Sequence, residues 1–204
     1  MNILLFGATG MIGQGVLREC LLDFDVQLVE VVGRSAGGVQ NPKLREIIHK
    51  DLWNYAAIES SLAGFDACFF CLGVTSVGME EKEYERITYG IATAAAETLC
   101  RLNPGMTFVF ISGAGSDSTE KGKLMWARIK GKTENALLRM PFKGVYVFRI
   151  GVAVPVHGER SRTGWYNMFY TFTRPFLPLL QFLFPSFITT TEEIGRAMLI
   201  IAKR

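Results

Sequence analysis

Short apolar runs alternate with amphipathic stretches along the first 150 residues of the chain. The apolar runs are typical of buried β-strands, because they lack the alternating polar positions of a half-exposed strand. The stretches between them place apolar residues three and four positions apart, as one face of a helix does. The pattern predicts strands at 3–6, 27–33, 46–50, 67–72, 106–112 and 145–150, with helices at 11–22, 81–102 and 123–139.

This alternation predicts an α/β fold, in which a doubly wound, mostly parallel sheet of Rossmann type is covered by helices on both faces. The whole chain, 1–204, is expected to form a single domain. A last helix is predicted to begin near Thr190, since Thr190 and Glu193 have the spacing of a capping box. Residues 157–190 differ in character, and we expect a small substrate lobe or lid there.

The composition fits a globular protein and narrows the classes of partner. The 204 residues are 49% hydrophobic and 20% charged, which excludes a disordered chain. The net charge is +3 without a run of Lys or Arg that would follow a phosphate backbone, so we expect no nucleic-acid partner. The histidines and cysteines lack zinc-site spacing, so no metal is expected. A secretory signal pattern is missing, which favours the cytoplasm.

The most informative stretch joins the first predicted strand to the first predicted helix. Gly7 permits a sharp turn, Gly10 lets the backbone approach a pyrophosphate, and Gly13 lets the helix pack close to the sheet. Unpaired amides at the start of a helix, with the positive end of its dipole, favour an anion. A glycine-rich turn without a ligand is the alternative. The cofactor-binding residues predicted here are Gly7, Thr9, Gly10, Met11, Ile12 and Gly13.

Arg34 follows the second predicted strand, where a protein that selects NAD usually has Asp or Glu. A charge-assisted hydrogen bond to a 2′-phosphate contributes about 1.5–3 kcal/mol, so we expect NADP(H) to be preferred by about tenfold or more. Later strand ends add Asp51 and Leu52 beside the adenine, and Leu72 and Gly73 beside the adenosine ribose. The alternatives are a solvated Arg34 and an Asp51 that serves a turn or a helix cap.

With these residues, the chain resembles the short-chain dehydrogenase/reductase superfamily. Among its atypical members, it is most similar to the group around the Tat-interacting, tumour-suppressor-type oxidoreductase. The resemblance rests on the Gly-x-x-Gly-x-x-Gly motif of residues 7–13 and on segments 71–73, 111–114 and 148–151, which follow in family order. It covers nearly the whole chain. It implies an NADP-binding fold with a seventh strand near Phe187 and an active site beside the nicotinamide.

The family's reaction uses a serine at the end of the fifth strand and a Tyr-x-x-x-Lys pair on the next helix. Ser112 matches the serine, and Lys130 matches the lysine, which would also bind the nicotinamide ribose. Trp126 stands where the resemblance requires tyrosine. An indole N–H donates a hydrogen bond but does not titrate usefully, so Trp126 cannot shuttle the proton and packs on the nicotinamide, on the substrate or on the protein itself. His157 and Tyr166 are further candidates for the proton donor.

Aromatic and apolar residues crowd between Trp165 and Phe187, and prolines interrupt the stretch, which argues against a membrane-spanning helix. Three interpretations stay open: an apolar substrate lobe, an exposed surface for a homodimer or a membrane, and plain core. The sequence therefore predicts an NADP(H)-dependent oxidoreductase for a small apolar carbonyl or alcohol. Its rival is a catalytically silent NADPH-sensing or regulatory protein that presents this segment to a partner or membrane.

Overall fold

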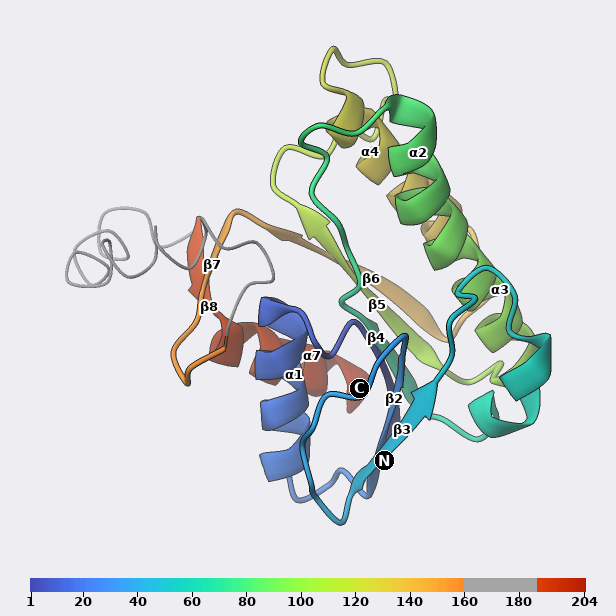
Figure 1. Ribbon diagram of the computed structural model, residues 1–204, viewed down its shortest axis with the longest axis vertical. Coiled ribbons are helices and arrows are strands. Elements are labelled where there is room, and N and C mark those ends of the chain that lie inside the picture. The colour runs from blue at the N-terminus through green and yellow to red at the C-terminus, as the bar shows by residue number, and fades with distance from the viewer. Residues whose placement is uncertain (160–186) are drawn as a thin grey trace.

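The computed structural model describes residues 1–159 and 187–204. Within these ranges, six strands form a parallel sheet in the order β3-β2-β1-β4-β5-β6 (Figure 1). The strands are β1 (Asn2–Phe6), β2 (Leu28–Gly33), β3 (Leu44–Ile48), β4 (Ala67–Phe70), β5 (Thr107–Gly113) and β6 (Gly144–Ile150). This arrangement confirms the predicted fold class.

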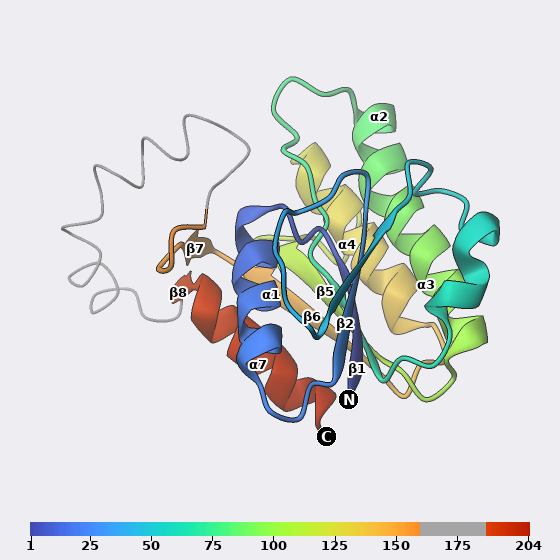
Figure 2. The same cartoon turned by 60° about the horizontal axis from the view of Figure 1, so that its bottom comes forward.

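Helices cover both faces of the sheet (Figure 2). On one face lie α1 (Met11–Leu22) and α7 (Thr191–Ala202). On the other lie α2 (Glu81–Glu85), α3 (Ile91–Leu102) and α4 (Met125–Leu138), with a 3₁₀ segment at Ala56–Leu62. Two hydrophobic cores result, one on each side of the sheet.

The central strand β1 is apolar along its length because both of its faces are buried. Successive side chains of a strand point to opposite faces. Ile3 and Leu5 belong to the core that α1 and α7 cover, whereas Leu4 and Phe6 belong to the core that α3 covers. All four side chains are fully buried. A strand of this kind carries no polar face that water could reach, as expected for a parallel sheet.

Several elements differ from their predicted bounds. β4 ends at Phe70, two residues before its predicted end, and α4 begins at Met125, two residues after its predicted start. β3 begins at Leu44, two residues before the predicted strand, and pairs Leu44 with Val29 of β2. It is one of the two edge strands of the sheet, and its side chains are half-buried or exposed, so its apolar pattern is weak. The predicted seventh strand does not extend the central sheet. Instead, β8 (Ile188–Thr190) pairs in parallel with β7 (Val152–Val154) in a separate two-stranded sheet.

A π-helical turn at Arg86–Gly90 interrupts the helix predicted over 81–102 and lies between α2 and α3. It coincides with a contact from Trp53, whose indole Nε1 donates a hydrogen bond to the Arg86 carbonyl oxygen at 3.0 Å. The Arg86 guanidinium lies 4.4 Å from the centre of the Trp53 ring. A Cβ at Gly90 would lie 3.3 Å from the same Nε1. The turn and the indole are therefore fitted to each other.

The predicted capping box starts α7. Thr190 Oγ1 accepts a hydrogen bond from the Glu193 amide at 3.0 Å, and Glu193 Oε2 accepts one from the Thr190 amide at 2.8 Å. The helix then packs closely on α1. A Cβ at Gly15 would lie 2.5 Å from the Thr191 side chain of α7, so only glycine allows this approach. The contact fixes α1, which follows the glycine-rich turn.

Most of the predicted substrate lobe, including Tyr166 and the aromatic residues 165–186, lies outside the described residues. Phe187 is described, and its side chain is 52% exposed. In the described ranges, every helix is too short or too polar to cross a membrane.

Candidate functional site

The turn after β1 has the close packing that its glycines suggest. Gly7 has φ of +81°, in the left-handed region that favours glycine, and a Cβ there would lie 2.6 Å from the Cys71–Leu72 peptide. A Cβ at Gly13 would lie 2.1 Å from the Gly7 carbonyl oxygen. At Gly10 the nearest approach would be 3.4 Å, to that same oxygen. Gly7 and Gly13 therefore set the packing, while Gly10 has room beside it.

The first turn of α1 presents backbone amides at this corner. The Gly10 amide donates to the Gly7 carbonyl oxygen at 2.9 Å, and the first bond of the helix runs from the Gln14 amide to the Gly10 oxygen at 2.8 Å. The amides of Met11, Ile12 and Gly13 precede that bond, so they have no acceptor within the helix. Together with the positive end of the helix dipole, they suit an anion.

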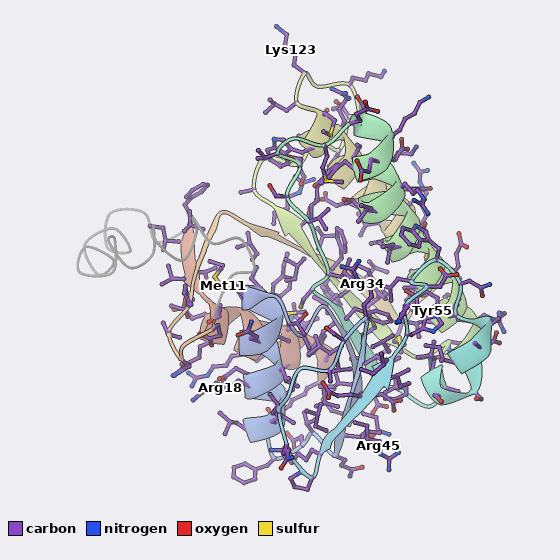
Figure 3. The ribbon with its side chains drawn as sticks, in the orientation of Figure 1. Met11, Arg18, Arg34, Arg45, Tyr55 and Lys123 are labelled. Carbon is purple, nitrogen blue, oxygen red and sulfur yellow. The ribbon has the colours of Figure 1, made fainter. Side chains whose placement is uncertain are left out.

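A pocket of about 160 Å³ adjoins the turn, where β1, β2 and β4 end. Figure 3 shows Arg34 beyond β2 and Met11 at the start of α1, both at this edge of the sheet. Ligands of open α/β sheets bind at this edge. The pocket also has an apolar wall of Trp53, Ile87 and Ile91, which was not predicted. The predicted residues that line it are Gly7, Thr9, Gly10, Arg34, Leu52, Leu72 and Gly73.

The remaining residues predicted for the cofactor lie beside this pocket. Met11, Ile12 and Gly13 form the first turn of α1. Asp51 is exposed, and its Oδ1 accepts a hydrogen bond from the Trp53 amide at 3.1 Å. This is the geometry of a turn aspartate, the alternative considered from the sequence. The contact between Asp51 and an adenine stays a prediction.

Ser112, near the end of β5, is buried against Glu134 of α4. Its Oγ donates a hydrogen bond to Glu134 Oε1 at 2.5 Å and lies 2.9 Å from the Ser116 Oγ. Glu134 is only 2% exposed, and Arg149 of β6 binds its Oε2 through Nη2 at 2.5 Å and Nε at 3.0 Å. The Ser112 hydroxyl is therefore held by a buried carboxylate, whose partner Arg149 keeps 42% of its side chain exposed.

Glu134 and Arg149 were missed as site residues in the sequence. A glutamate on an amphipathic helix is usually exposed, so nothing local marks Glu134 as buried. The available signal was Arg149, which stands inside an otherwise apolar strand. An arginine in such a strand favours a carboxylate on a neighbouring element, because a charge-assisted hydrogen bond stabilises both groups.

Lys130 lies one helical turn before Glu134 on α4 and reaches back to β5. Its Nζ donates a hydrogen bond to the Ile111 carbonyl oxygen at 3.2 Å and lies 5.1 Å from the centre of the Phe110 ring. Burial lowers the pKa of Lys130 to about 8, although the Glu134 carboxylate acts in the opposite direction. The lysine thus lies near Ser112 and the buried Glu134 carboxylate, at the end of the strand where the resemblance requires it.

Trp126 packs over the backbone that follows β5. A Cβ at Gly113 would lie 3.3 Å from the Trp126 ring, and one at Gly115 would lie 3.4 Å from it. The indole therefore covers two glycines, and it is half-buried. This contact matches the packing interpretation of Trp126, and a contact with nicotinamide or substrate stays a prediction.

His157 follows β7 and pairs with the first turn of α7. Its Nε2 lies 2.5 Å from Glu192 Oε2, and Arg196 binds the same carboxylate at 2.6 Å. His157 borders a second cavity of about 670 Å³ on the outer side of α1, which Thr9 and Arg18 also line. Its role as a proton donor stays a prediction.

Comparison with known proteins gives distant relatives, and no family model matches the chain. The chain is 25% identical over 208 residues to the mitochondrial protein FMP52 of Meyerozyma guilliermondii, covering 99% of this chain and 85% of that one. It is 29% identical over 161 residues to the mitochondrial protein FMP52-2 of Scheffersomyces stipitis, and this match covers 78% of this chain and 67% of that one. These names contradict the predicted cytoplasmic location. That prediction was wrong because it rested on the pattern of a secretory signal, which does not bear on delivery to an organelle.

Solved structures share the fold at low sequence identity. MoeE5, in complex with UDP-glucose and NAD, has a TM-score of 0.72 and 18% identity over 99% of this chain and 72% of its own. For UDP-glucose 4-epimerase of Thermotoga maritima, solved with UDP-glucose, the TM-score is 0.69 and the identity 17%, over 98% and 73%. For WbmG of Bordetella bronchiseptica, solved with NAD, the TM-score is 0.60 and the identity 13%. The match covers 76% of this chain and 54% of WbmG. The likeness establishes a Rossmann-type fold.

Proposed function

We propose that the protein is an NADP(H)-binding oxidoreductase that acts on a small apolar carbonyl or alcohol. It would belong to the short-chain dehydrogenase/reductase superfamily, in the atypical group around the Tat-interacting, tumour-suppressor-type oxidoreductase. The observation that carries the proposal is the turn of residues 7–13, where helix amides and a pocket meet at the carboxyl edge of the sheet. The mitochondrial names of the relatives favour a mitochondrial location.

The residues around the pocket fit a dinucleotide. The amides at the start of α1 suit its pyrophosphate, and Leu52, Leu72 and Gly73 offer an apolar surface to adenosine. Arg34 is exposed on the pocket wall, where its guanidinium suits the 2′-phosphate of NADP. A bound nicotinamide would supply hydride transfer. Two of the solved structures with this fold, MoeE5 and WbmG, were determined with NAD.

The class of substrate rests on the composition of residues 165–187, which are rich in aromatic side chains. Such a segment favours a hydrophobic ligand over a sugar. Its outer side would serve a second copy of the chain or a membrane surface.

Calorimetry with NADPH and NADH tests the cofactor, and single-turnover oxidation of NADPH against a panel of carbonyl compounds tests the reaction. We expect NADPH to bind more tightly than NADH and to be oxidised by an apolar carbonyl. A protein that binds neither dinucleotide would contradict the proposal as a whole. Tight binding without oxidation by any carbonyl would contradict the reaction and leave the cofactor assignment in place.

A silent NADPH-sensing protein is the second candidate, and two observations favour it. Trp126 occupies the position of the family's acid, and the Ser112 hydroxyl is already donated to Glu134. The substitution Trp126→Tyr separates the two functions. Reductase activity that appears only in the variant would support the sensor, whereas activity in the unaltered protein would contradict it.

A further inference from the structure

Three charged side chains gather at the end of β5: Lys130 and Glu134 from α4, and Arg149 from β6. Glu134 is buried, and Arg149 neutralises it at 2.5 Å. Lys130 therefore adds a second positive charge beside one carboxylate, and Arg149, with 42% of its side chain exposed, is the cation that water can reach. Burial removes water that would stabilise the Lys130 ammonium, so it favours the neutral amine and lowers the pKa of Lys130.

The contacts of Lys130 do little to oppose that loss. Its Nζ donates to the Ile111 carbonyl oxygen at 3.2 Å and lies 5.1 Å from the Phe110 ring centre. An ammonium has three N–H donors, so this backbone bond leaves others for a substrate. Neither contact carries a negative charge, and a neutral amine retains N–H groups for the same bond.

The other charged groups around α4 are engaged on its opposite side. Glu81 of α2 binds Arg128 at 2.7 Å, and Glu85 of α2 binds Lys132 at 2.5 Å. Lys132 also lies 4.8 Å from the centre of the Tyr89 ring. On the side of α4 that faces β5 and β6, the charge that acts on Lys130 is that of Glu134, which Arg149 also binds.

We propose that Lys130 is the proton donor of the reaction, in place of the tyrosine that Trp126 replaces. A bound dihydronicotinamide would supply a hydride that forms a C–H bond at the substrate's carbonyl carbon. As the C=O π bond breaks, an N–H bond of Lys130 breaks and its proton forms the O–H bond of the alcohol. Lys130 is left as a neutral amine and regains a proton from water. This inference rests on the proposed function.

The acidity of Lys130 agrees with this role. General acids work best when their pKa is near the pH of the reaction, and burial brings the pKa of Lys130 down to about 8. Ser112 is less suited, because its hydroxyl hydrogen is held by Glu134 and a serine hydroxyl is a weak acid. Ser112 would orient the substrate, and Lys130 would give the proton to the substrate oxygen.

Amine labelling tests the state of Lys130 without any substrate. The protein is acetylated with acetic anhydride at graded pH, and the modified lysines are quantified by mass spectrometry. Lys132 is an internal control two residues away, since its ion pair with Glu85 raises its pKa above the usual 10.5. We expect the midpoint of Lys130 labelling near pH 8, and the midpoint of Lys132 above pH 10.5. In Glu134→Gln, the Lys130 midpoint should fall further, because a charge that raises it is removed. Equal midpoints for the two lysines would overturn the proposal.

Substitution tests the role in proton transfer. Single-turnover oxidation of NADPH should slow by about 100-fold or more in both Lys130→Met and Lys130→Arg, because neither side chain releases a proton near neutral pH. Lys132→Met should react at the unaltered rate. A Lys130→Arg variant that also reacts at the unaltered rate would show that only the positive charge matters, and this would overturn the proposal.

Calorimetry with NADPH separates this inference from the function on which it rests. If the unaltered protein binds no NADPH, the proposed function fails, while the labelling midpoints still report whether Lys130 holds its proton weakly. If NADPH binds and is oxidised equally by the unaltered protein and by Lys130→Met, the function stands and the role of Lys130 is wrong.

Discussion

Gly13 packs directly against the backbone of Gly7, so that a Cβ at position 13 would lie 2.1 Å from the Gly7 carbonyl oxygen. The same oxygen accepts the Gly10 amide at 2.9 Å. One carbonyl therefore joins the end of β1, the turn and the first turn of α1. The direction of the helix amides toward an anion depends on this close approach.

Gly13→Ala should distort that contact. Backbone cannot yield as a flexible side chain does, so we expect the free energy of unfolding to fall by about 1–3 kcal/mol, as in overpacked cores. Urea denaturation measures the change. Gly10→Ala is the matched control, because its Cβ would come no closer than 3.4 Å to the Gly7 oxygen. It should keep the stability but weaken NADPH binding, since the methyl group would occupy the space beside the pyrophosphate. Equal stability losses in both variants would contradict the packing argument.

Arg34→Ala should remove the preference for NADPH. The loss of a charge-assisted hydrogen bond of about 1.5–3 kcal/mol corresponds to a factor of about ten or more in Kd for NADPH. The Kd for NADH should change little, because NADH lacks the 2′-phosphate. Calorimetry measures both constants, and Arg45→Ala controls for the loss of one exposed positive charge outside the pocket. If the unaltered protein bound both dinucleotides equally, the assignment of Arg34 would be wrong.

Glu134→Ala should lower the free energy of unfolding. It would leave Ser112 without its acceptor inside the core, whereas water would solvate Arg149, whose side chain is 42% exposed. A buried polar group left without a partner typically costs about 1–3 kcal/mol, which is the loss expected here. Glu85→Ala breaks an exposed ion pair with Lys132 and should cost about 0–1 kcal/mol. Chemical denaturation compares the two. A loss from Glu134→Ala as small as that from Glu85→Ala would show that the buried carboxylate contributes nothing to stability.

Thr190→Ala should lower the free energy of unfolding by about 1 kcal/mol, the usual contribution of a helix cap, as urea denaturation would measure.

The cap of α7 also makes the stability depend on pH. The hydrogen bond from the Thr190 amide lowers the pKa of Glu193 below its usual 4.5. Its contribution is therefore complete above pH 4.5 and is lost as the pH falls through the lowered value. Thermal unfolding between pH 7 and pH 3 should show a smaller loss for Glu193→Gln than for the unaltered protein, and parallel curves would refute this assignment.

Features fixed by neighbours in the sequence were predicted well. β1 was recognised because Ile3 to Phe6 are all apolar and Gly7 ends the run. The sharp turn at Gly7, the helix start at Met11 and the cap at Thr190 each depend on residues within a few positions of one another. Arg34 lines the pocket because it directly follows a well-marked strand, and its contact with a 2′-phosphate stays a prediction.

Features fixed by distant contacts were missed. The spacing of apolar residues over 81–102 is that of a continuous helix, and the π-helical turn coincides with a contact from Trp53, which lies far earlier in the chain. Glu134 looks like a surface residue until Arg149 and Ser112, from two different strands, are brought to it. β3 was shifted by two residues because an edge strand has little apolar pattern to mark its ends.

The position of β1 in the centre of the sheet has a consequence for how the chain folds. Ile3 pairs on one side with Val29 and on the other with Ala67. During synthesis, β1 and β2 can associate early, but the opposite edge of β1 keeps open N–H and C=O groups until β4 has emerged. An open apolar edge invites pairing with other chains. Closing the long loop before β4 is an entropic barrier, so the arrival of Ala67–Phe70 would be the step at which folding outcompetes aggregation.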